Sequence, residues 1–232
     1  MLGTIKKQKR GTLRELEYER YILSTHPVLW LPLYRSGGSV IKSADGFGHI
    51  CTVTGATWGK YGRTFDGDDD NIDCGNASSL QISGDFTVEI WIYISTLPSV
   101  LTHNENVVKK QGNSANTGYY LYLEKANDKA YMVAFNGTTL KEGYSGVLTV
   151  GLHHLVGIVS GTTVSIYDNL VKGTDGVNLT GGLVADTGNN LTIGTASNSV
   201  SGIVGEVREY SRALSLGGIT ANNQNTKWRY QS

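Results

Sequence analysis

Five aspartates gather in one short segment of the chain, namely Asp66, Asp68, Asp69, Asp70 and Asp73. Calcium binds six to eight hard oxygen ligands, and a segment dense in carboxylates supplies them. The spacing is not that of an EF-hand loop, because Gly67 comes too early and no glutamate closes the segment. Two interpretations stay open: a calcium site formed by the first four of these aspartates, and a structural turn with its carboxylates in water.

Two histidines are adjacent at His153 and His154. Neighbours on a strand point to opposite faces, so one metal ion cannot take both imidazoles. Zinc would need further ligands, and the sequence has no Cys-x-x-Cys or His-x-x-x-His pattern. We expect a structural pair, with one imidazole packed inside through a hydrogen bond and the other on the surface.

Glu89 is the carboxylate whose position on a strand could correspond to a catalytic acid of a glycoside hydrolase. Such enzymes need two carboxylates across the scissile bond, about 5 Å apart for a retaining mechanism. On its own strand face Glu89 is followed by Trp91 and Tyr93, so the partner acid is missing. The sequence also has no Gly-x-Ser-x-Gly elbow, Walker loop or dinucleotide-binding fingerprint. We therefore expect a protein that is not an enzyme.

Aromatic and amide side chains in or near predicted loops are the remaining candidates for ligand binding, because sugars stack on aromatic rings and bond to amides. The candidate ligand-binding residues are Trp58, Tyr61, Asn104, Asn113, Tyr119 and Tyr144. For each ring the alternative is packing in the core or at a sheet edge. The polar segment 104–116 that holds the two asparagines has a second interpretation as a mobile connector.

Cys51 and Cys74 are the two cysteines of the chain. A disulfide would require their Cα atoms to lie within about 7 Å, which the sequence does not decide. Because no framework of paired cysteines is present, we expect free thiols.

The composition is that of a neutral β-rich protein. Twenty basic and 20 acidic residues cancel, which argues against nucleic-acid partners that need a basic face. Glycine is abundant at 30 residues and proline scarce at 3, a pattern typical of strands and turns.

No segment reaches the roughly 18 apolar residues that would span a bilayer, so we expect no membrane insertion. The basic start leads into the charged segment 14–20 rather than an apolar core, so we expect no signal peptide and synthesis in the cytosol, compatible with a virion component.

The elements that must position these residues are strands. The clearest is 86–94, where apolar residues alternate with Thr87, Glu89, Trp91 and Tyr93. Further strands are predicted at 28–33, 118–124, 129–135, 155–159, 163–167, 191–194 and 203–210, with a short helix after Arg212.

The first 24 residues differ from the rest of the chain. A basic cluster precedes Thr12, which can cap a helix with Glu15 completing a capping box. Leu13, Leu16 and Leu23 form a narrow apolar stripe on that helix. We divide the chain into an arm, 1–24, and a sandwich, 25–232; the arm either docks, on the sandwich or a neighbouring copy, or is a partly ordered extension.

Four segments in register resemble laminin-G-like domains of the concanavalin A-like lectin and glucanase superfamily. They are 64–72 (TFDGDDDNI), 86–92 (FTVEIWI), 152–156 (LHHLV) and 205–214 (GEVREYSRAL). The resemblance covers about residues 27–220. Leu152 replaces the usual tryptophan, and Asn169–Leu170 stands where the family often has Asn-Gly.

The resemblance implies an all-β fold, a two-sheet antiparallel jelly roll. It also implies non-catalytic binding, often to glycans or extracellular proteins and sometimes with calcium. Our first hypothesis is a lectin-like module that binds a glycan or a surface protein. The second is a structural protein of a particle, such as a virus or phage decoration, fibre or tail component, that joins neighbouring copies through residues 1–24. A glycoside hydrolase comes third.

Overall fold

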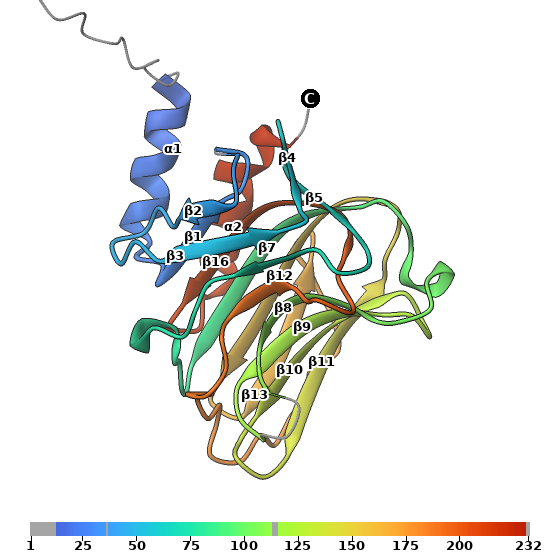
Figure 1. Cartoon of the computed structure of the whole chain (residues 1–232). Helices are drawn as coiled ribbons and strands as arrows, with labels where there is room; N and C mark the ends of the chain where they lie inside the picture. Colours follow the sequence, from blue (N-terminus) through green and yellow to red (C-terminus); the bar gives the residue numbers. More distant parts are fainter. Residues whose placement is uncertain (1–12, 36, 113–115, 231–232) are drawn as a thin grey trace, which may run out of the picture.

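Alternating apolar residues give strand β7 (Phe86–Ile94) a core-facing side made of Phe86, Val88, Ile90 and Ile92. Around it the chain folds into two stacked antiparallel sheets (Figure 1). This computed structural model describes residues 13–35, 37–112 and 116–230. The prediction of a jelly-roll sandwich preceded by a helical segment is confirmed.

Sheet A contains β7 at its centre. In spatial order its strands are β14 (Val171–Lys172), β13 (Thr163–Asp168), β12 (Gly151–Ser160), β7, β16 (Ser201–Tyr210), β5 (Gly62–Asp66) and β4 (Thr57–Gly59), with β1 (Leu29–Pro32) also paired to β16. Sheet B runs β11 (Leu140–Val147), β10 (Lys129–Phe135), β9 (Tyr119–Glu124), β8 (Glu105–Lys110), β15 (Thr192–Gly194), β6 (Asn71–Asp73), β3 (Ile50–Thr54) and β2 (Val40–Lys42). Short 3-10 turns lie at Ser78–Leu80, Pro98–Val100 and Lys227–Arg229.

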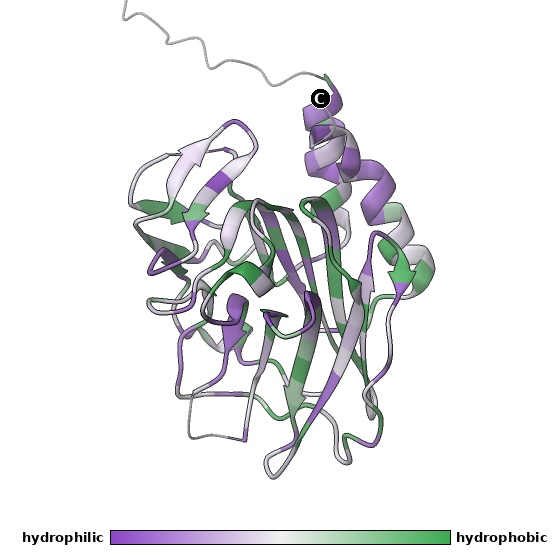
Figure 2. Ribbon diagram, turned by 90° about the vertical axis from the view of Figure 1, so that its right-hand side faces the viewer, coloured by the Kyte–Doolittle hydropathy of each residue, from purple (hydrophilic) through white to green (hydrophobic). Residues whose placement is uncertain are grey.

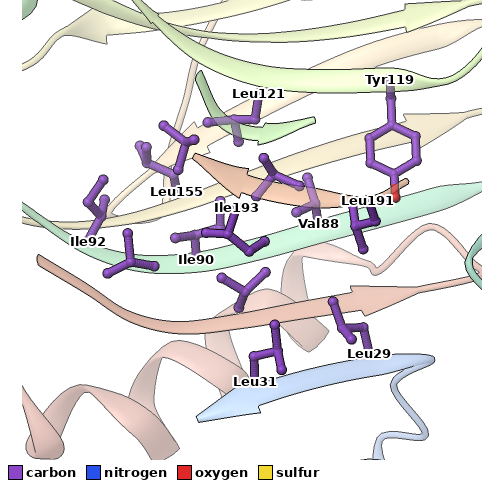
Figure 3. Packing of buried hydrophobic residues seen from close by; sticks show 14 of the residues in the cluster. Leu29, Leu31, Val88, Ile90, Ile92, Tyr119, Leu121, Leu155, Leu191 and Ile193 are labelled. Atoms are coloured by element: carbon purple, nitrogen blue, oxygen red, sulfur yellow. The ribbon is translucent and has the colours of Figure 1, made fainter. Parts of the chain in front are cut away.

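The main core fills the space between the two sheets (Figure 3). Val88 and Ile90 of sheet A face Leu121 and Ile193 of sheet B, and all four side chains are fully buried. Each such side chain contributes about 1.5–3 kcal/mol through burial. This core supports both sheets and leaves their outer faces for other contacts.

The outer face of sheet A is covered by helices, and it carries a buried polar network. Helix α2 (Leu216–Thr226) begins at Ser215, whose hydroxyl accepts a hydrogen bond from the N–H of Gly218. Asn222 of this helix donates to Glu89 at 2.7 Å, and Asn223 contacts His154 at 3.0 Å. The predicted helix after Arg212 is therefore present, and it seals charged groups away from water.

Helix α1 (Leu13–Ser24) lies beside α2 (Figure 1) and is mostly hydrophilic (Figure 2). Its contact face is formed by Tyr18 and Ile22, which pack with Trp30 and Tyr34. The three leucines of the stripe predicted from the sequence are not in that face: Leu13, Leu16 and Leu23 are 73%, 45% and 45% exposed. The helix thus docks on the sandwich through its aromatic side and leaves its leucines in solvent.

The β13–β14 hairpin tip shows the departure noted at Asn169–Leu170. Both residues have positive φ, 50° and 70°, in a region that favours glycine. The side chain of Leu170 packs against the small cluster formed by Val156, Ile158 and Ile219. This apolar packing offsets part of the cost of the strained backbone conformation.

The two cysteines are free thiols, as expected, and both are buried. None of the described helices is long and apolar enough to cross a membrane.

Candidate functional site

Sheet B carries an open cavity of about 790 Å³ on its outer face. We call it the sheet B groove; its described lining residues are Thr102, His103, Asn104, Asn106, Lys109, Gln111, Asn116, Tyr120, Tyr122, Lys125, Phe135 and Asn198. The groove is formed mainly by β8 and β9 and by the segments that flank them. A cavity of this size accommodates several sugar rings or an equivalent length of another polymer.

A row of aromatic side chains crosses the sheet beside and within this groove. Its members are Phe135, Tyr120, Tyr122, Tyr131 and Tyr144, and successive ring centroids lie 6.0, 5.5, 5.1 and 5.4 Å apart. Cross-strand pairing explains the row, because Tyr131 of β10 lies opposite both Tyr122 of β9 and Tyr144 of β11. We call this set the aromatic row.

Two tyrosines of the row, Tyr120 and Tyr122, keep their hydroxyl groups protonated. Burial, followed by the nearby carboxylates of Glu142 and Glu124, raises the pKa of both Tyr120 and Tyr122. A neutral phenol offers an O–H donor and an acceptor next to an apolar ring. The row is therefore suited to ligands that are apolar on one side and rich in hydroxyl groups on the other.

Amide groups hold the rim of the groove in place. The side chain of Asn104 donates to Glu124 at 3.0 Å and accepts from the N–H of Lys125 at 3.1 Å. Asn106 donates from its side chain to Thr195 at 3.3 Å and from its backbone to the Asn198 carbonyl at 2.8 Å. These bonds make the rim a preformed surface rather than a set of free side chains.

Three basic side chains, His103, Lys109 and Lys125, line the groove. Lys125 donates to the carbonyl of Thr102 at 2.7 Å, and His103 contacts the carbonyl of Gly67 at 2.9 Å. Lys109 is half-buried, and this burial lowers its pKa. No Asp or Glu is among the described lining residues, although the carboxylates of Glu124 and Glu142 lie close to Tyr120 and Tyr122.

The structure places two of the predicted ligand-binding residues in the groove or in the aromatic row beside it. Asn104 lines the groove, and Tyr144 ends the aromatic row. Tyr144, predicted in or near a loop, lies on strand β11. Asn113 lies outside the described residues.

The prediction for Tyr119 is wrong. Its side chain points between the sheets, is 1% exposed and donates a 2.8 Å hydrogen bond to Glu209. Its neighbour Tyr120 faces the groove instead, since successive residues of a strand point to opposite faces.

Trp58 and Tyr61 lie away from the groove, near the β4–β5 turn. Trp58 is 53% exposed, and its indole donates to the carbonyl of Tyr34 at 3.0 Å. Tyr61 borders a separate apolar pocket on sheet A together with Trp91 and Tyr93.

Sequence reasoning missed most of the aromatic row, although a signal was present. In the segment 119–123 the tyrosines at 120 and 122 alternate with buried Leu121 and Leu123. This alternation indicates a strand whose solvent face is aromatic. The polar segment 104–116 was also misjudged in part as a connector, because 105–110 forms strand β8.

Three of the four predicted calcium ligands converge. Carboxylate oxygens of Asp66, Asp69 and Asp70 lie within 4.8 Å of one another, whereas Asp68 is not in this group. Asp70 also accepts a hydrogen bond from the N–H of Asp66 at 2.9 Å, as in a structural turn. Both interpretations of the segment are compatible with this geometry, and calcium stays a prediction.

Glu89 and the two histidines form structural contacts. Glu89 is fully buried, lies 2.9 Å from Arg208 and contacts His154 at 2.7 Å. Burial by itself would raise the pKa of Glu89. Arg208, His154 and Asn222 outweigh that effect and hold the pKa below its ordinary value. The expectation that one histidine lies on the surface is wrong: His153 is also buried, between Asp168 and the carbonyl of Thr149, because its strand face points toward the core.

Solved structures with similar folds include enzymes and binding domains. A Trypanosoma rangeli sialidase in complex with sialic acid has a TM-score of 0.69 at 15% identity, and the match covers 94% of this chain and 38% of the sialidase. The binding domain of botulinum neurotoxin serotype D has a TM-score of 0.68 at 12% identity, covering 88% of this chain and 52% of that domain. The receptor binding domain of the C/D mosaic serotype gives 0.67 at 12%, covering 86% and 51%. At these identities the likeness shows the fold alone.

The chain spans about half or less of each of these proteins. None of the curated protein sequences compared matches it. The family model described as "Concanavalin A-like lectin/glucanases superfamily" matches residues 66–220, two thirds of the chain, and includes three of the four resembling segments in full. The chain therefore belongs to the concanavalin A-like lectin and glucanase superfamily.

Proposed function

We propose that this protein is a non-catalytic, lectin-like module that binds a glycan in the sheet B groove. The observation that carries the proposal is the aromatic row, with four half-buried tyrosines at spacings of 5.1–5.5 Å beside an open groove. Each tyrosine combines an apolar ring with a hydroxyl group, which matches the two kinds of surface on a sugar. The glycan is free or is carried by a surface protein.

The neighbours' functions support a binding role without fixing the ligand. Two of them are binding domains of botulinum neurotoxins, and one is a sialidase bound to sialic acid. Lys109 and Lys125 in the lining could pair with a carboxylate or sulfate group of a glycan.

A non-catalytic role is supported by the position of Glu89. Its carboxylate is sealed beneath α2 and committed to Arg208, so it cannot contact a substrate. Hydrolysis would require a pair of accessible carboxylates on opposite sides of the bond.

The first experiment is a glycan array with the full chain, followed by titration calorimetry on the strongest ligand. Tyr122→Ala should weaken that ligand at least tenfold, since central aromatic residues dominate binding energy. Tyr122→Phe separates the hydroxyl from the ring. Trp58→Ala is the matched control, an exposed aromatic residue outside the groove. Equal affinity of Tyr122→Ala and wild type would refute the groove as the binding site.

A second candidate function is favoured by one observation. Helix α1 exposes Leu13, Leu16 and Leu23 to solvent, a surface suited to contact with a second copy. Under this alternative the protein is a self-assembling component of a particle, such as a virus or phage fibre. Light scattering of the full chain and of a variant with all three leucines changed to serine tests it. Assembly that the triple variant loses supports the particle role, and a monomer in both cases rejects it.

A further inference from the structure

The two free cysteines lie on neighbouring strands of sheet B. Cys51 is in β3, and Cys74 directly follows β6. These strands are antiparallel, with Thr52 opposite Asp73 and Val53 opposite Ile72. One step further in the same register, Cys51 lies opposite Cys74.

The side chains of both cysteines also point to the same side of the sheet. Each belongs to the core cluster between the sheets, with exposures of 0% and 3%. Directly opposite residues of an antiparallel pair have Cα atoms about 4.5–5.5 Å apart. Disulfides usually join Cα atoms separated by about 4.4–6.8 Å, so this pair meets the requirement without backbone movement.

The thiols are in contact in the reduced protein. A hydrogen bond with Cys51, together with burial, raises the pKa of the Cys74 thiol well above its ordinary value. A protonated, buried thiol reacts slowly, so the reduced form persists until the strands open. Only a local opening of the sheet is required, because β3 is the second strand from the sheet edge and only the short edge strand β2 lies beyond it.

We propose that Cys51 and Cys74 form a cross-strand disulfide when the protein meets a disulfide oxidant such as oxidised glutathione. The thiolate of one cysteine attacks the oxidant and releases one glutathione thiolate. The second cysteine then attacks the mixed disulfide and releases another. Two thiols lose two protons and two electrons in total, and one oxidised glutathione becomes two reduced molecules.

The bridge ties the β2–β3 edge of sheet B to β6, next to the acidic segment 66–70. Closing a loop in the unfolded chain stabilises the folded state, and here the native geometry already fits. The protein would therefore be stable as a dithiol in a reducing compartment and more stable as a disulfide in an oxidising one.

The experiment equilibrates the full chain with oxidised glutathione, both in plain buffer and in urea just below the unfolding midpoint. Urea promotes opening of the strands, so the oxidant can reach both thiols even though they are buried in the folded protein. We expect mass spectrometry to show the loss of two hydrogen atoms and a peptide that joins Cys51 to Cys74. We also expect Tm to rise by several degrees and to return on treatment with dithiothreitol.

Single variants supply the controls. Cys51→Ala and Cys74→Ala should each gain at most one glutathione and show no rise in Tm. The proposal is overturned if wild type in the urea arm keeps two alkylatable thiols, or if it carries one glutathione on each cysteine. Cross-links only between chains would overturn it equally.

Discussion

The guanidinium of Arg208 lies 2.9 Å from the carboxylate of Glu89, and both side chains are fully buried beneath α2. Glu206 lies 3.5 Å from the same guanidinium and accepts a 2.8 Å hydrogen bond from the indole of Trp30. Tyr18 of α1 also donates to Glu206. One arginine therefore compensates two buried carboxylates and links the central strands of sheet A to both helices.

Replacing Arg208 by methionine should leave both carboxylates without their cation. We expect a loss of about 3–5 kcal/mol in the free energy of unfolding, the usual cost of breaking a buried ion pair. Urea unfolding measures this as a lower midpoint. Adding Glu89→Gln to Arg208→Met should recover part of the loss, because one orphaned charge is removed. Additive losses in the double variant would show that the two residues do not interact.

The docking of α1 predicts unequal effects for two of its apolar residues. Ile22→Ala removes a fully buried side chain and should cost about 2–5 kcal/mol. Leu16→Ala, on the exposed side of the same helix, should change stability by less than about 0.5 kcal/mol. Thermal unfolding of both variants distinguishes a docked helix from a loose extension. An equal, small effect of both substitutions would contradict the docked position.

The aromatic row predicts recognition of an extended chain, if the proposed glycan site is correct. Affinity should rise with oligosaccharide length until the ligand reaches Tyr131, which lies beyond the residues that line the groove. Tyr131→Ala should then weaken long oligosaccharides about tenfold and leave the shortest ones unchanged. Calorimetry across a length series checks this. A uniform loss at all lengths would indicate a structural role for Tyr131 instead.

Two buried carboxyl groups predict that stability falls as pH rises. Burial raises the pKa of Glu105 to about 7 and that of Glu209 to about 8, from an ordinary value of 4.5. The N–H of Ser201 offsets part of the first shift, and Tyr119 and Lys110 offset part of the second. Between pH 4.5 and the raised pKa of each group, the folded state binds more protons than the unfolded chain. The free energy of unfolding therefore decreases as pH rises through this range.

Thermal unfolding between pH 4.5 and pH 8 measures this effect. At pH 4.5 both groups are protonated in the folded state and about half ionised in the unfolded chain, and they penalise folding most above pH 8. Glu105→Gln should flatten the decrease in Tm between pH 4.5 and pH 7. Glu142→Gln, at an exposed position, serves as the control and should retain the wild-type slope. A wild-type Tm that does not fall over this range would reject buried, proton-binding carboxyls.

Calcium should stabilise the protein if the acidic segment holds the ion. The carboxylates of Asp66, Asp69 and Asp70 converge, and a divalent cation would relieve their mutual repulsion. We expect millimolar calcium to raise Tm, chelator to reverse the change, and Asp69→Asn to abolish it. Glu17→Gln, an exposed change on α1, is the control. A Tm that is independent of calcium would leave the segment as a structural turn.

The sequence by itself determined the fold. Strand periodicity was clear where one face is buried, as in β7, and the four segments shared with the superfamily lie in the order that a jelly roll requires. Local patterns also located the helix after Arg212 and the strands predicted at 118–124, 129–135, 155–159 and 163–167. These features follow from neighbours in the chain, so the residues alone specify them.

Only the tertiary structure decided which side chains share a surface. Tyr131 meets Tyr122 and Tyr144 through the register of three strands, which no single strand's pattern encodes. Tyr119 was misjudged for another reason: successive residues of β9 face opposite sides, so a one-residue difference separates the core from the groove. The buried charges of Glu89 and Arg208 likewise depend on helices that cover sheet A. Contacts between distant segments are set by packing, and packing becomes defined only when both sheets and both helices are assembled.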